Sequence, residues 1–62
     1  MHYIQITDEQ LEVLREVLRR ELEAIKIEVF RTDMHDFKEM LKHRREVLDR
    51  LLEKVSAQPV VL

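Results

Sequence analysis

Three side chains in the second half of the chain have a spacing that could bind a metal ion. Asp36, Glu39 and His43 are three and four residues apart, so a helix would carry them along one side. Carboxylate and imidazole groups suit divalent transition metals. The Glu-x-x-His pairs of di-metal helix bundles are missing, and solvated helix surfaces show the same spacing. We therefore assign no metal site to these residues.

Residues suited to catalysis are scattered along the chain. Neither His2 nor His35 belongs to a serine or carboxylate pattern that would suggest a nucleophile and its base. The chain has no cysteine and no glycine, which excludes thiolate metal sites and glycine-rich phosphate loops. Only three aromatic residues are present, which is little material for a substrate pocket. We predict that the protein is not an enzyme and binds no cofactor.

Five basic residues could form a ribbon across the outward faces of two helices: Arg15, Arg19, Lys38, Lys42 and Arg45. In length and expected architecture the chain resembles the Rop type of four-helix bundle, in which paired hairpins bind RNA through such a ribbon. Here acidic residues are interspersed with the basic ones and the net charge is -2, which disfavours phosphate binding. Nucleic-acid binding is therefore the alternative interpretation.

The first element that positions these side chains is a helix over residues 7–30. Its start is a capping box, Thr7-Asp8-Glu9-Gln10, in which the side chains of Thr7 and Gln10 each bond to the other's backbone N–H. Two apolar rows follow at helical spacing. The first row consists of Leu11, Leu14, Leu18, Leu22, Ile25 and Val29. The second row consists of Val13, Val17, Ala24 and Ile27.

A turn over residues 31–33 and a second helix over residues 34–55 complete the expected hairpin. Thr32 and Asp33 are good N-cap residues for the second helix. That helix carries one wide apolar stripe: Met34, Phe37, Met40, Leu41, Val47, Leu48, Leu51, Leu52 and Val55. Folding about the turn places Ile25 opposite Met40 and Leu41. Further layers pair Leu14 with Leu51, Leu18 with Val47 and Leu48, and Val29 with Phe37.

Both termini are expected to be extended. Residues 1–6 alternate polar and apolar side chains, and Pro59 follows the end of the second helix. In a hairpin, Tyr3–Ile6 and the apolar tail Val60–Leu62 emerge at the same end. They fray independently or pair as a short two-stranded ribbon, within or between chains.

One polar layer interrupts the apolar pattern. Arg44 lies near the centre of the second helix's stripe, and Glu21 is its expected opposite on the first helix. We predict an ion pair between Glu21 and Arg44, within the hairpin or across a dimer, which would fix the register of packing. The alternative is that the Arg44 stem packs while its guanidinium reaches water.

A hairpin buries only the first row, because one neighbouring helix covers only one row. We therefore predict an all-α, antiparallel two-helix hairpin that forms a homodimer, a four-helix bundle with coiled-coil-like packing, through the second row. Alternatively, the second row binds a helix of another protein. A chain of 62 residues is one domain, spanning 1–62, and domains this small often need a partner for stability.

The sequence shows no membrane span and no secretory signal, so we expect a cytoplasmic protein. Residues 7–55 resemble a group of very short bacterial proteins of unknown function. The similarity consists of a capped first helix, the Thr32-Asp33 turn, Phe37 with Leu41, and paired leucines at the end of the second helix. The resemblance implies a helical hairpin and no activity.

Overall fold

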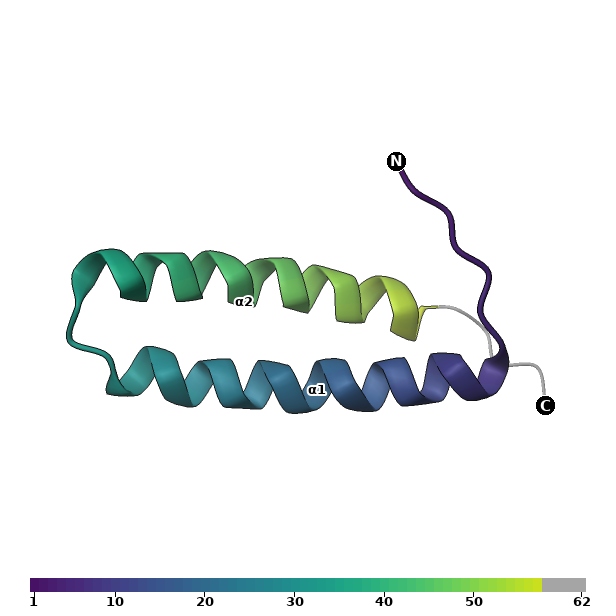
Figure 1. Ribbon diagram of the computed structural model, residues 1–62, viewed down its shortest axis with the longest axis horizontal. Helices are drawn as coiled ribbons and strands as arrows, with labels where there is room; N and C mark the ends of the chain where they lie inside the picture. The colour runs from purple at the N-terminus through teal and green to yellow at the C-terminus, as the bar shows by residue number, and fades with distance from the viewer. Residues whose placement is uncertain (58–62) are drawn as a thin grey trace.

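The protein is a hairpin of two antiparallel helices. The structure is a computed structural model, and it describes residues 1–57. Helix α1 spans Asp8–Arg31 and helix α2 spans His35–Ser56, joined by a short turn (Figure 1). The described residues contain no strand. The predicted all-helical hairpin is confirmed, and both helices lie within one or two residues of their expected bounds.

The capping box at the start of α1 is confirmed in both directions. The Gln10 backbone N–H donates to the Thr7 hydroxyl oxygen at 3.1 Å, and the Thr7 backbone N–H donates to Gln10 Oε1 at 2.9 Å. Asp8 and Glu9 follow in the first turn, where the helix dipole favours negative charge. The start of α1 is therefore fixed by local interactions alone.

Replacing Thr7 with alanine tests this cap. Thr7→Ala removes the acceptor for the Gln10 N–H, and we expect it to lower the free energy of unfolding by about 1 kcal/mol. Urea unfolding followed by far-ultraviolet circular dichroism measures the change. Thr7→Ser, which keeps the hydroxyl, should leave the stability almost unchanged. An equal loss in both variants would show that the hydroxyl contributes nothing.

The turn differs from its prediction in one respect. Met34, not Thr32 or Asp33, is the N-cap residue of α2, and no side chain caps this helix. Thr32 instead ends α1, where its backbone N–H donates to the Glu28 carbonyl oxygen at 3.0 Å. The physical reason is that Thr32 is used by the preceding helix, so the chain leaves α1 one residue later than expected.

The core is small and lies along the first row of α1. Leu22 and Ile25 form a buried cluster with Leu41 of α2. Three half-buried residues pack against this cluster: Val29, Leu48 and Leu52. Leu11 and Leu18 are also buried. Among residues 1–57, no residue with a polar or charged side chain is buried. The contact between Ile25 and the Leu41 layer is as predicted.

Helix α2 is rotated relative to the prediction. Met40 is 56% exposed and Phe37 is 42% exposed, so neither fills the layer expected of it opposite Ile25 and Val29. Lys38, expected on the outer face, is instead half-buried. The stripe of α2 is wider than one neighbouring helix can cover, and α1 covers its Leu41, Leu48, Leu52 and Val55 side.

The hairpin is a thin rod, with principal extents of 45 × 24 × 14 Å. Its radius of gyration is 14.0 Å, against about 10.6 Å for a compact domain of this length. The N-terminal segment leaves α1 beside the C-terminal end of α2, as expected for a hairpin (Figure 1). The alternative in which Tyr3–Ile6 pairs with Val60–Leu62 involves residues outside the described range and stays a prediction.

Candidate functional site

The side chains that sequence patterns marked for metal binding do not form a site. Asp36, Glu39 and His43 are exposed on α2, and no cluster of three or more metal-ligating side chains occurs in residues 1–57. Glu39 accepts an ion pair from Lys42 at 3.4 Å. These residues form a solvated surface in the described structure.

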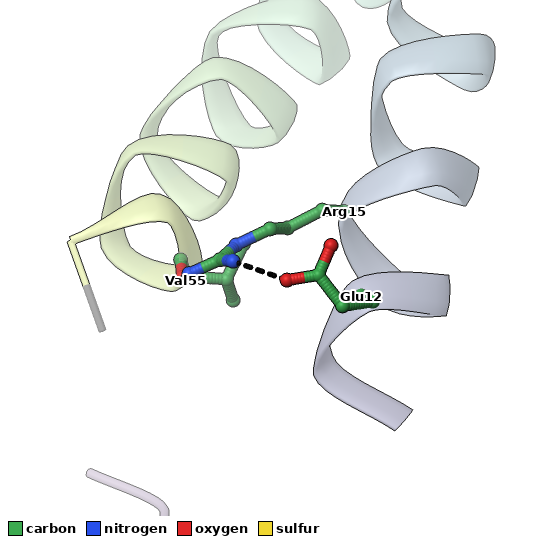
Figure 2. A network of polar contacts seen from close by, with 3 residues as sticks. All are labelled: Glu12, Arg15 and Val55. Atoms are coloured by element: carbon green, nitrogen blue, oxygen red, sulfur yellow. Dashed lines mark hydrogen bonds and ion pairs between the residues drawn. The ribbon is translucent and has the colours of Figure 1, made fainter. Parts of the chain in front are cut away.

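The basic ribbon is also interrupted. Arg15 turns inward: its Nε and Nη2 donate to the carbonyl oxygen of Val55 at 3.2 and 2.9 Å (Figure 2). Its Nη1 pairs with Glu12 at 2.9 Å, and the side chain is only 11% exposed. Lys38 is half-buried and Lys42 is paired with an acid. Arg15 thus links α1 to α2 at the open end of the hairpin, where α1 begins and α2 ends. The sequence pattern did not suggest this role.

The largest unexplained feature is an apolar surface that the hairpin leaves open. All four residues of the second row are exposed, and Val17, for example, is 52% exposed. Helix α2 adds four further apolar side chains, which the sequence pattern had assigned to the hairpin core: Phe37, Met40, Val47 and Leu51. We call these eight residues together the apolar face.

The two halves of the apolar face lie on one side of the hairpin. Residues of a helix are about 100° apart, so Val17 lies about 110° round α1 from its buried row. Met40 and Val47 lie about 90–110° round α2 from its buried side, in the same rotational sense. Because the helices are antiparallel, equal rotations in one sense bring both rows to the same side. Val13 and Ile27 lie about 150–190° round α1 in the same sense, beyond this side and facing away from α2.

A groove at the open end supports this placement. Leu14 of α1 and Leu51 of α2 line the same groove, together with Ile4 and Ile6 of the N-terminal segment. A second, shallow groove on α2 surrounds Arg44 and is lined by Met40 and Val47. Near the open end, Leu14 therefore extends the apolar surface from Leu51 of α2 to α1, and the apolar face is indented along α2.

The opposite side of the hairpin is charged. Arg19 and Lys26 of α1 are rotated from the core in the sense opposite to Val17, as are Arg45 and Asp49 of α2. Lys26 pairs with Glu23 at 3.4 Å on this side. The hairpin thus has one apolar and one charged side.

The predicted pair of Glu21 and Arg44 is not formed within the hairpin. Both residues are exposed, and the ion pairs within residues 1–57 do not join them. The prediction of an ion pair between Glu21 and Arg44 within one hairpin is therefore wrong. The physical reason is that the rotation of α2 carries Arg44 from the core to the apolar face. The pair across a dimer stays a prediction.

Neither described helix is long and apolar enough to cross a bilayer. Comparisons with protein-family models, with curated proteins and with solved structures found no match to this chain.

Proposed function

We propose that the protein is a non-enzymatic, self-associating helical hairpin that acts as a small assembly module, with the apolar face as its contact surface. The observation that supports this proposal is the exposure of the eight apolar residues, six of which lie on one side of the rod: Val17, Ala24, Phe37, Met40, Val47 and Leu51. Soluble monomers rarely leave a continuous apolar surface of this size in water. In this proposal, two hairpins cover each other's apolar faces and form a four-helix bundle.

The exposed area of the chain supports the same proposal. The whole chain exposes 5711 Å², whereas a compact monomer of 7.6 kDa exposes about 4,300 Å². The extended N-terminal segment contributes part of this excess. A standard protein interface removes about 800 Å² of exposed surface from each partner. The excess exposed area of this chain is therefore large enough to supply one dimer interface.

Light scattering at micromolar concentration tests the proposal. We expect a dimer with twice the monomer mass of 7.6 kDa. A clean monomer at this concentration would overturn self-association and would favour the alternative in which the apolar face binds a helix of a different protein.

Substituting Val17 locates the contact surface. Val17→Glu places a carboxylate in the middle of the apolar face, and burying that charge without a partner is costly, so the dimer should dissociate. Light scattering measures the change in mass, and circular dichroism should show that the helices persist. Arg19→Gln, which changes the net charge by the same amount but lies on the charged side, is the control and should leave the dimer intact. A Val17→Glu protein that stays dimeric would place the contact elsewhere.

A further inference from the structure

We propose that the apolar face takes a second copy of this chain, related by a twofold axis that runs along the helices. In this arrangement α1 packs on α2 of the partner subunit, both turns lie at the same end, and Glu21 pairs with Arg44 of the partner subunit. This inference rests on the proposed self-association and adds its geometry.

The first observation is the position of the two charges. Ile25 and Leu41 pack together, and the helices are antiparallel. Glu21 lies about one turn before Ile25, and Arg44 lies about one turn after Leu41. Both steps lead toward the open end, so the two charged residues lie at the same height along the rod. Each is rotated toward the apolar face and is exposed.

The second observation is what surrounds these charges. Toward the open end, the next residues of the apolar face are Val17 on α1 and Val47 on α2. Toward the turn, they are Ala24 on α1 and Met40 on α2. A partner that covers these apolar layers must therefore also cover the charged layer between them. A buried charge without an opposite charge is strongly unfavourable, so the partner must supply an acid and a base at this height.

Only one simple twofold arrangement supplies both. When the axis runs along the rod, every residue of α1 meets the residue of the partner's α2 at the same height. Val17 then faces Val47, Ala24 faces Met40, and Glu21 faces Arg44, each pair occurring twice. The register needs no adjustment, because the hairpin itself sets which residues share a height.

The other arrangement places the axis across the rod. Helix α1 then packs on α1 of the partner subunit, running in the opposite direction, and the turns lie at opposite ends. With the axis at the charged layer, Glu21 meets Glu21 of the partner subunit and Arg44 meets its own copy. Any other register places these charges against apolar or unrelated residues. Like charges in contact across an interface repel each other strongly, so this arrangement is disfavoured.

The ion pairs are expected to select the arrangement and to add little affinity. Desolvation of a carboxylate and a guanidinium offsets most of their attraction, whereas a mismatched arrangement leaves both charges unpaired. The apolar layers on either side supply the affinity, and the charged layer supplies the orientation.

Single cysteines at the two ends distinguish the arrangements, since the chain has none of its own. Asp33→Cys places a thiol in the turn, and Ser56→Cys places one at the end of α2, about 30–36 Å away at 1.5 Å per residue. With a bismaleimide much shorter than the helices, each single-cysteine protein should crosslink to itself. A mixture of the two should give no mixed product. Mixed product without self-crosslinking would overturn the proposed arrangement.

The same cysteines in a Val17→Glu background are the matched control. This background is expected to be monomeric, so the crosslinks should disappear if they come from the apolar face. Crosslinks that persist in this background would have to come from random collisions or from another surface. That result would overturn the proposal. If wild-type light scattering shows a monomer, self-association itself fails; a dimer that gives mixed crosslinks leaves self-association standing and removes only this geometry.

Charge reversal tests the pair directly. Glu21→Arg and Arg44→Glu each place like charges together twice per dimer, and we expect each to weaken dimerisation by about 100-fold or more. A one-to-one mixture of the two variants restores both pairs and should recover wild-type affinity as a mixed dimer. Asp49→Arg, an exposed charge reversal on the charged side of the hairpin, is the control. If the single reversals weaken dimerisation no more than this control does, the pairing is overturned. A mixture of the two variants that fails to associate would also overturn it.

Discussion

Ile25→Ala should unfold most of the protein at room temperature. Ile25 is 2% exposed and belongs to the buried cluster with Leu22 and Leu41. Truncating a fully packed isoleucine removes its transfer free energy and leaves a cavity, at a cost of about 2–5 kcal/mol. A hairpin with so few buried residues has little stability in excess of that amount. Urea unfolding followed by circular dichroism should show a much lower midpoint or no folded baseline.

Ile27→Ala is the matched control for this prediction. The two isoleucines are on the same helix, two residues apart, so both substitutions raise helix propensity equally. Ile27 is 52% exposed and contributes little to the hairpin core. At concentrations low enough to keep the chain monomeric, we expect a loss below about 1 kcal/mol. Equal losses in the two variants would show that the buried cluster does not stabilise the hairpin.

Arg15→Met should loosen the open end of the hairpin. The two hydrogen bonds from Arg15 to the Val55 carbonyl oxygen cross between helices at the last turn of α2 (Figure 2). Carbonyl groups in the last turn lack helical partners, and the charge of Arg15 complements the negative end of the helix dipole. Methionine keeps an apolar side chain but donates nothing. We expect a loss of about 1.5–3 kcal/mol, the range for hydrogen bonds from charged groups.

The readout that distinguishes this role from general destabilisation is local. Amide hydrogen exchange should rise most in the last turn of α2, which Arg15 holds, and less near the turn of the hairpin. Arg19→Met is the control, because Arg19 is exposed and has no hydrogen bond or ion pair with residues 1–57. Uniform exchange along both helices, or equal effects of the two substitutions, would contradict the proposed role of Arg15.

Comparing α1 with α2 shows why some elements are easier to predict than others. Helix α1 begins at a capping box, and its two apolar rows are separated by charged residues, so both its start and its buried row follow from the sequence. Helix α2 has no side-chain cap and one wide stripe in which Met40 and Leu41 are equally apolar by pattern. Periodicity cannot decide which side of such a stripe is buried.

The number of helices, their antiparallel order and the buried row of α1 follow from the sequence, because they depend on local capping and on residue spacing. The rotation of α2, which buries Leu41 and exposes Phe37 and Met40, depends on the packing of the two helices and has no local signal. The bond from Arg15 to the end of α2 likewise could not be predicted, since a contact across 40 residues leaves no local signal. The same rotation moves Arg44 out of the core, because burying leucines against the first row is more favourable than burying an unpaired guanidinium.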